Sequence, residues 1–386
     1  MSAPTAADRR RSCLWLAALA ARNCGAVGRL VRAAGGFAEV ADMPVGEIER
    51  LHRACRRSRL PPADEGAPES FADVCGCADR GVVTWFDTAY PQGLRDLYDP
   101  PPALFVSGRG WQAKLARLAT QPAVAIVGSR GPSPYGREMA AGLARELTAW
   151  GVAVVSGLAL GIDAVAHREV LAVLRASARP NVVPCAVLGC GASVVHPRQH
   201  RRLFLAMHDA GLLVSEYGWD LPAAAWRFPA RNRVIAALSQ AVIVVEGRAD
   251  SGALHTAAFA AETGRDVLAV PGEAGRPLAA GPHHLLRDGA HLCESAADVL
   301  ALLPQVPAKA GQAPESRWAP ADPCEARVFA GLQNGEQTVD ELAQATGLAI
   351  LEVVAATSRL EVAGRVAAVA GGRYRVVRVA DVGSHT

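Results

Sequence analysis

Six short apolar runs, each followed by a loop rich in small residues, constrain the fold of this chain more than any other feature. They lie at residues 123–127, 152–155, 183–188, 212–214, 241–245 and 267–270. Helical patterns follow most of the loops. Strands that are apolar on both faces belong inside parallel sheets that helices cover on both sides. Residues 71–303 are therefore predicted to form a doubly wound α/β domain with a Rossmann-like, mostly parallel sheet.

Two segments of different character flank this predicted domain. Residues 1–60 show helical periodicity, broken by a Gly-x-x-Gly turn at Gly25 and Gly28 that is typical of helix-hairpin-helix or SAM-like domains. Residues 323–379 show three helical patterns and a hairpin around Gly371-Gly372, which predicts a winged helix. Connectors rich in Pro, Ala and acidic residues, at 58–70 and 304–323, separate the three parts.

The positive charge is unevenly distributed along the chain. The net charge is only +3, and the chain holds two lysines, so arginine supplies the cations. Residues 1–60 carry eleven Arg against five Asp or Glu, whereas residues 61–120 carry a surplus of three acidic residues. A broad basic face on the middle domain is therefore excluded. A polyanion would have to bind there through a few focused arginines.

The nine cysteines and the apolar segments indicate the compartment. No C-x-x-C pair occurs, and Cys75 and Cys77 are too close for a zinc knuckle, so free thiols and a cytoplasmic location are expected. The run Cys13–Ala21 follows three arginines and could imitate a signal peptide, but its apolar periodicity continues and favours the first helix of a domain. No other apolar stretch is long enough for a membrane span.

The loops at the strand ends carry the candidate binding residues. Small residues there expose backbone amides at helix N-termini, where anions bind. Because the carboxyl ends of parallel strands meet at one edge, these loops predict an anion or nucleotide pocket. The candidate residues are Gly128, Ser129, Arg130, Ser156, Gly157, Arg198, His200, Arg201, Arg231, Arg233, Ser251 and Gly252.

Several of these groups also have a purely structural interpretation. Arg231 and Arg233 could pair with Glu216 or Glu246 instead of touching a ligand. Asp163 and His167 lie four apart on one predicted helix, where they are expected to lock their loop by hydrogen bonds, and a catalytic pair is the alternative. His196 with His200, and Cys190 alone, are weak candidates for a metal site and a nucleophile, so we predict no metal and no catalytic residue. Trp219 and Trp226 could stack on bases or close the site as packed side chains.

Five stretches resemble the DNA-processing protein A family (DprA, also called Smf). They read DPPPALFVSG at 99–108, IVGSRGPSPYG at 126–136, VSGLALGIDAVAH at 155–167, FPARNRVIAAL at 228–238 and SGALHTA at 251–257. The resemblance implies a protein without cofactor or catalytic activity that binds single-stranded DNA in a positive pocket. It also implies a homodimer formed through the Rossmann-like domain and a role in loading the RecA recombinase, as in natural transformation.

Some features depart from the family pattern or leave an alternative open. His200 stands where the family commonly has Asn, and Gly281-Pro282-His283 replaces a usual Gly-x-Asn. The third helix of the predicted winged helix carries Glu352, Glu361 and only Arg359, which suits a phosphate backbone poorly.

The alternative to a DNA-binding protein is an enzyme of the lysine-decarboxylase-like group that binds nucleotides or hydrolyses nucleoside monophosphates. The absence of that group's catalytic Glu after residue 256 argues against it.

Overall fold

The computed structural model describes residues 4–22, 26–55, 79–176, 182–306, 322–333, 335–363, 365–369 and 371–376. Its contacts divide the chain into two units, Met1–Gly311 and Gln312–Thr386. The division falls inside the predicted second connector, whereas the first helices group with the sheet. Residues 56–78, which include the first predicted connector, lie outside the described residues. The three-part division thus stays a proposal.

A nine-stranded sheet with the order β1-β2-β6-β5-β4-β3-β7-β8-β9 forms the centre of the first unit. Its strands are β1 (Arg80–Thr84), β2 (Ala103–Ser107), β3 (Ala123–Val127), β4 (Ala153–Ser156), β5 (Cys185–Val187), β6 (Leu212–Ser215), β7 (Ala241–Val244), β8 (Asp266–Ala269) and β9 (His291–Leu292). The strands from β6 to β9 in this order pair in parallel. β1 and β2 extend the sheet in antiparallel pairing. All six predicted strands are confirmed, and the mostly parallel Rossmann-like fold with them.

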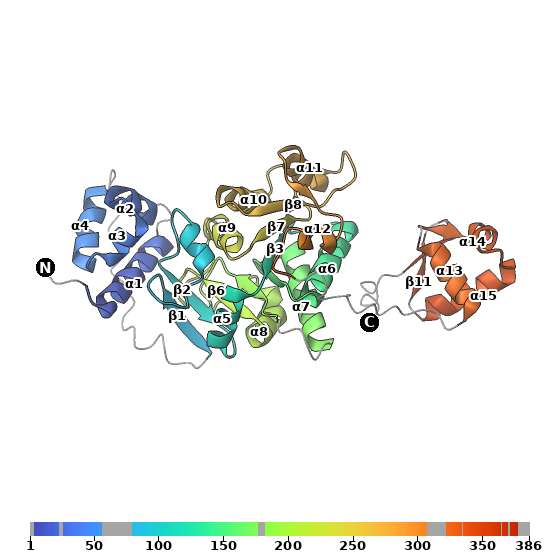
Figure 1. Ribbon diagram of the computed structural model, residues 1–386, viewed down its shortest axis with the longest axis horizontal. Helices are drawn as coiled ribbons and strands as arrows, with labels where there is room; N and C mark the ends of the chain where they lie inside the picture. Colours follow the sequence, from blue (N-terminus) through green and yellow to red (C-terminus); the bar gives the residue numbers. More distant parts are fainter. Residues whose placement is uncertain are drawn as a thin grey trace. The chain divides into compact units, whose positions relative to one another are not determined.

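Helices cover both faces of this sheet (Figure 1). One face packs against α5 (Trp111–Thr120), α9 (Arg227–Ala237) and α10 (Gly252–Glu262). The other face packs against α6 (Pro134–Ala149), α7 (Ile162–Ala176), α8 (Arg201–Ala210) and α12 (Ala296–Leu300). The shorter elements are η2 (Gln92–Asp96), η3 (Arg198–His200), η4 (Pro277–Ala279) and α11 (Ala280–Arg287).

Strand β3 shows why the apolar runs are continuous instead of alternating. Ala123, Ala125 and Val127 join the core beneath α9 and α10. Val124 and Ile126 join the core beneath α6 and α7. Because successive side chains of a strand point to opposite faces, a strand covered on both faces needs apolar residues throughout.

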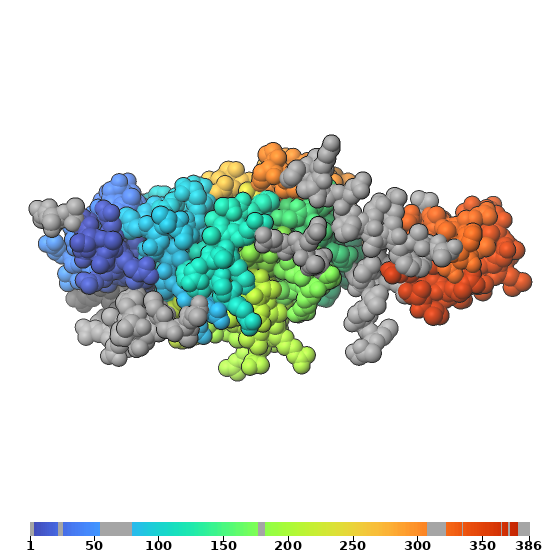
Figure 2. Space-filling model, turned by 60° about the horizontal axis from the view of Figure 1, so that its bottom comes forward, coloured from blue at the N-terminus to red at the C-terminus, as the bar shows by residue number. Residues whose placement is uncertain are grey.

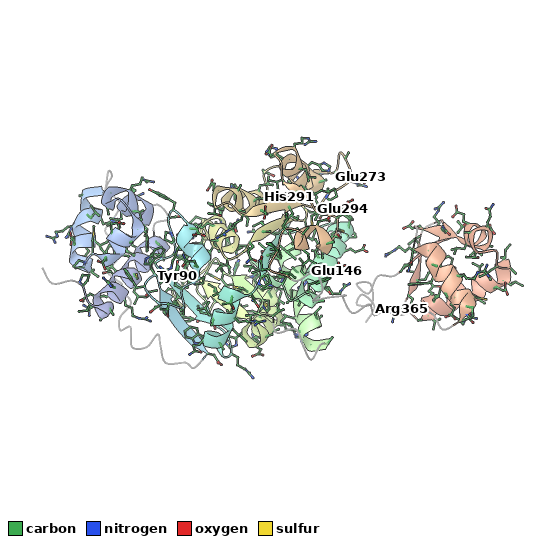
Figure 3. All side chains as sticks on the ribbon, in the orientation of Figure 1. Tyr90, Glu146, Glu273, His291, Glu294 and Arg365 are labelled. Carbon is green, nitrogen blue, oxygen red and sulfur yellow. The ribbon has the colours of Figure 1, made fainter. Side chains whose placement is uncertain are left out.

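The N-terminal segment forms four helices, α1 (Ala6–Arg22), α2 (Ala26–Ala34), α3 (Phe37–Asp42) and α4 (Val45–Cys55). They enclose their own core, and α1 also packs against β1 and β2. In Figure 2 the blue N-terminal segment adjoins the cyan part of the chain. Phe37 of α3 contacts Trp85 with ring centroids 4.7 Å apart, and Trp85 in turn contacts Tyr90, which is labelled in Figure 3. The predicted Gly-x-x-Gly turn falls partly on residues 23–25, which lie outside the described residues.

The second unit has the predicted winged-helix elements. They are α13 (Pro323–Leu332), α14 (Val339–Thr346) and α15 (Ile350–Val362), with β10 (Gln337–Thr338), β11 (Val366–Val369) and β12 (Arg373–Val376). The strands form one sheet in the order β10-β12-β11. Gly371 and Gly372 take φ values of 84° and 69°, which only glycine adopts readily, so the predicted hairpin turn is built on them. Seven buried side chains form a separate core.

Within the described residues, no helix is both long and apolar enough to span a membrane.

The independence of the two cores predicts the behaviour of a shortened chain. A fragment that ends at Val306 keeps Leu302, Leu303 and Val306 against the sheet core. We expect this fragment to fold, with a thermal midpoint within about 3 °C of the corresponding transition in the full chain. Circular dichroism and differential scanning calorimetry measure both. Aggregation of the fragment, or a much lower midpoint, would show that the second unit stabilises the first.

Candidate functional site

A cavity of about 410 Å³ lies at the carboxyl ends of the parallel strands. Its walls come from the loop after β3, the loop after β4, helix α9 and the start of α10. Strands β4, β5 and β6 lie on one side of β3, and β7 and β8 lie on the other side. This is the switch point of a doubly wound sheet, where such folds bind their ligands.

Half of the predicted site residues line this cavity. They are Gly128, Ser129, Arg130, Arg231, Ser251 and Gly252. Ser251 is the N-cap of α10, and its hydroxyl accepts a hydrogen bond from the amide of Ala253 at 3.3 Å. The cavity thus holds an exposed arginine at one wall and the positive end of an eleven-residue helix at the other.

The loop after β3 is held in place by one buried carboxylate. Glu246 accepts hydrogen bonds from the Ser133 amide at 2.9 Å and from the Ser133 hydroxyl at 2.5 Å. The Ser129 amide donates to the Glu246 carbonyl at 2.7 Å. Glu246 therefore fixes Ser129 at the cavity. The sequence had offered Glu246 as one possible partner of Arg231 and Arg233, but it pairs with neither of them.

Arg231 is a buried wall of the cavity. Its guanidinium donates to the carbonyl of Gly157 at 2.8 Å and to the carbonyl of Val187. A Cβ at position 157 would lie 2.4 Å from this guanidinium, so glycine is required there to admit Arg231. Burial lowers the pKa of Arg231, and the nearby carboxylate of Asp163 opposes that shift.

Arg233 does not line the cavity, but it anchors helix α9 beside it. It pairs with Glu216 at 2.7 Å and with Asp99 at 3.2 Å. Burial disfavours its charge, but these carboxylates outweigh burial and hold the pKa of Arg233 above its usual value. The pairing with Glu216 is the structural alternative that the sequence left open, and contact of Arg233 with a ligand stays an untested prediction.

Three other predicted site residues use their polar groups inside the protein. The Ser156 hydroxyl is buried and donates to the carbonyl of Ile126 at 2.7 Å. The Gly157 amide donates to Asp163 at 3.0 Å. The ring of His200 is buried, with Nδ1 3.0 Å from the carbonyl of Leu158. Their place at strand ends therefore also serves the protein itself, because that edge has to satisfy its own buried backbone, and their contact with a ligand stays a prediction.

The remaining predicted arginines lie outside the cavity lining. Arg198 belongs to η3, and Arg201 begins α8. Both side chains are exposed, as is that of Arg202. Their part in binding stays a prediction.

Among the cavity-lining residues that were not predicted as site residues are Phe228, Arg248 and Thr256. The Phe228 ring lies 5.7 Å from the Arg130 guanidinium and 5.1 Å from the ring of His196. Thr256 is 1% exposed, and its hydroxyl has no hydrogen-bond partner among the described residues. Phe228 and Thr256 stand in stretches that the sequence had singled out, at 228–238 and 251–257. Only the fold shows which side chains of these stretches line the cavity.

Asp163 makes the predicted hydrogen bonds, whereas His167 does not. Asp163 accepts hydrogen bonds from the amides of Gly157 and Ala159, which locks the loop after β4. Neither ring nitrogen of His167 has a hydrogen-bond partner among the described residues. Burial raises the pKa of Asp163, although Arg231 and these amides oppose the shift. His167 is fully buried, and burial lowers its pKa to about 3, so the ring stays neutral in the folded protein.

The other reactive candidates are also part of the packing. Burial raises the pKa of the Cys190 thiol to about 11, which disfavours the nucleophilic thiolate. Trp219 is buried against Phe105 with centroids 5.6 Å apart. Among the described residues, no three His, Cys, Asp or Glu side chains come together as a metal site.

The comparison with protein-family models identifies the family of this chain. The model described as DNA recombination-mediator protein A matches residues 81–304, and the model of the DprA winged helix domain matches residues 311–372. The chain belongs to the DprA family of DNA recombination mediators. The resemblance seen in the five sequence stretches is thereby confirmed.

Similar proteins support the assignment to the DprA family. Protein Smf of Escherichia coli is 38% identical over 301 residues, which cover 76% of this chain and 76% of that protein. The X-ray structure of DprA from Streptococcus pneumoniae matches with a TM-score of 0.59 and 32% identity, covering 74% of this chain and 96% of that one. DprA from Helicobacter pylori, described by its single-stranded DNA binding mode, matches with a TM-score of 0.50 and 28% identity, covering 58% of this chain and 95% of that one.

The buried imidazole of His167 predicts a pH-dependent stability. Below pH 6.5 the unfolded chain binds a proton at this ring, whereas the folded protein does so only near pH 3. Stability is therefore fully present above pH 6.5 and is lost as the pH falls, by about 2 kcal/mol between pH 7.5 and 5. We expect His167→Leu to lose this part of the pH dependence in urea unfolding curves. The exposed His284 gives the control His284→Leu, which should keep it. Equal slopes for all three proteins would show that His167 takes up its proton in the folded state.

Proposed function

We propose that this protein binds single-stranded DNA in the cavity between β3 and β7 and acts there as a recombination mediator. The observation that carries the proposal is the composition of the cavity wall. Exposed Arg130 and Arg248, the N-terminus of α10 and Thr256 line the same cavity as the Phe228 ring, and the Thr256 hydroxyl has no hydrogen-bond partner among the described residues. Cations and donors suit a phosphate, and an aromatic ring suits an unstacked base.

This chemistry favours single strands over duplex DNA. A base can stack on Phe228 only if it is free of its neighbours, and a duplex keeps its bases stacked inside. The remaining groups bind phosphate and carry no sequence information. Binding is therefore expected to be largely independent of sequence. The DprA of Helicobacter pylori, a relative described by its single-stranded DNA binding mode, supports this assignment.

As a mediator, the protein would protect incoming or exposed single strands and help RecA to assemble on them, as in natural transformation. The family described as DNA recombination-mediator protein A supports this role.

We further propose a homodimer formed through the Rossmann-like domain. Support comes from β9 at the end of the sheet, where His291, labelled in Figure 3, and Leu292 are exposed. An exposed sheet edge offers unpaired backbone groups to a second chain.

A non-enzymatic role in the cytoplasm completes the proposal. Cys13, Cys185, Cys190, Cys293 and Cys324 are free thiols, and all of them except Cys324 are buried. Helix α10 has no acidic residue in its first turn, where hydrolases of the lysine-decarboxylase-like group carry a catalytic Glu near their glycine-rich loop. Nucleoside-monophosphate hydrolysis is the less favoured candidate, and an assay for release of free base tests it directly.

The winged helix is not proposed as the main DNA-binding element. The only arginine of α15, Arg359, pairs with Glu325 at 2.6 Å and lies near Asp322. The exposed face of α15 presents Leu351, Val362 and two glutamates. A phosphate backbone repels acidic groups and offers apolar groups no favourable contact. Such a surface suits a protein partner.

A comparison of DNA forms tests the proposal. We expect the full chain to bind a single-stranded oligonucleotide of about 20 nucleotides more tightly than the matching blunt duplex, with affinity falling as salt rises from about 50 to 200 mM. The fragment ending at Val306 should keep most of this binding and a slightly smaller salt slope. Fluorescence anisotropy measures both. Equal or tighter binding of the duplex would refute the proposal, and a folded fragment without binding would move the site to the winged helix.

The role of Arg130 is tested by a single substitution. Its side chain is exposed and makes no ion pair among the described residues. Arg130→Ala should therefore leave the thermal midpoint unchanged and weaken single-strand binding roughly tenfold or more, the loss expected for a charge-assisted contact of about 1.5–3 kcal/mol. Arg109→Ala is the matched control, because Arg109 is exposed and pairs with Asp209 away from the cavity. An unchanged dissociation constant for Arg130→Ala would remove Arg130 from the site.

A further inference from the structure

Trp226 is an exposed aromatic side chain at the start of the helix that builds the cavity wall. It is the N-cap residue of α9 and is 36% exposed. Trp219, the other tryptophan of this region, is buried against Phe105. The two tryptophans that the sequence offered as stacking candidates thus differ in their exposure to solvent. Only Trp226 presents its ring to solvent.

The Trp226 ring is held in one orientation. It meets the ring of Tyr217 edge to face, with centroids 6.1 Å apart and an interplanar angle of 87°, and Tyr217 is only 1% exposed. The Arg227 guanidinium lies 5.2 Å from the Trp226 ring and 5.0 Å from the Tyr217 ring. Such contacts fix an exposed indole at little cost in side-chain entropy when a partner binds.

The position of Trp226 links the cavity to the N-terminal helices. Phe228, which lines the cavity, lies two residues further along the same first turn of α9. Between them, Arg227 donates to the carbonyl of Ala21, at the end of α1, at 2.8 Å. Helices α1 to α4 carry eight Arg against five Asp or Glu, including the exposed Arg32 of α2. Trp226 therefore adjoins, along the chain, both a residue that lines the cavity and a residue that contacts the basic N-terminal helices.

From this arrangement we infer that Trp226 is a second base-stacking platform, which extends the single-strand site out of the cavity toward the N-terminal helices. The inference rests on the proposed single-strand binding. Successive bases of one strand can stack on successive aromatic groups, while the phosphates between them follow the positive potential. The strand that leaves Phe228 on this side thus meets a pre-oriented ring before it reaches α1 and α2.

The substitution Trp226→Ala tests this platform. It should weaken binding of a thymidine oligonucleotide of about 20 nucleotides roughly tenfold, the loss of one stacked base. The salt slope should not change, because no phosphate contact is removed. Trp226→Phe keeps an aromatic face and should restore most of the affinity, while the DNA-induced quenching of tryptophan fluorescence falls. Tyr98→Ala is the control, since Tyr98 is 60% exposed on another segment, between η2 and β2.

The outcomes separate this inference from the proposed function. Unchanged affinity of a folded Trp226→Ala protein, or equal losses in the Ala and Phe variants, would overturn the platform. Unchanged fluorescence quenching in Trp226→Phe would also overturn it, and this measurement serves even if the Ala variant does not fold. Loss of binding in Arg130→Ala with full binding in Trp226→Ala would leave the cavity site intact and refute only the extension. No single-strand binding by the unsubstituted chain would refute the proposed function itself.

Discussion

The cavity depends on two buried guanidinium groups of helix α9. Arg231 binds the carbonyls of Gly157 and Val187, which follow or end strands β4 and β5. Arg233 pairs with Glu216, which follows β6. A buried charge without partners is strongly destabilising, so each arginine holds its loop in one position. One helix thereby ties together the ends of three neighbouring strands and keeps the cavity wall in shape before any ligand arrives.

This anchoring separates two kinds of residue at the same sheet edge. One kind, which includes Ser156, Gly157 and His200, satisfies buried polar groups of the protein itself. The other kind, Arg130 and Thr256, faces the cavity with binding capacity left over. Preorganised donors bind phosphate without an ordering cost, and this favours a site that accepts any sequence.

The other parts of the chain relate differently to this site. The N-terminal helices pack against β1 and β2 and reach α9 through the contact between Arg227 and Ala21. They belong to the same unit as the cavity and can shape the path of a bound strand. The winged helix has its own core and a recognition helix whose exposed face is apolar and acidic. A role in protein contacts suits that surface better than a role in holding DNA.

The sequence by itself determined six strands of the sheet, the winged helix and the sheet edge where the cavity lies. Apolar runs such as 123–127 can exist in water only if both faces are covered, and small residues at their ends mark helix N-termini. It could not assign β1 and β2, because their antiparallel pairing beside β6 is made by contacts between distant segments. Nor could it tell that Arg231 and Arg233 are buried and Arg130 is exposed, since all three stand in similar motifs. Only the tertiary structure decided which guanidinium meets a buried carbonyl or carboxylate and which faces solvent, because burial and partners are properties of the packed chain.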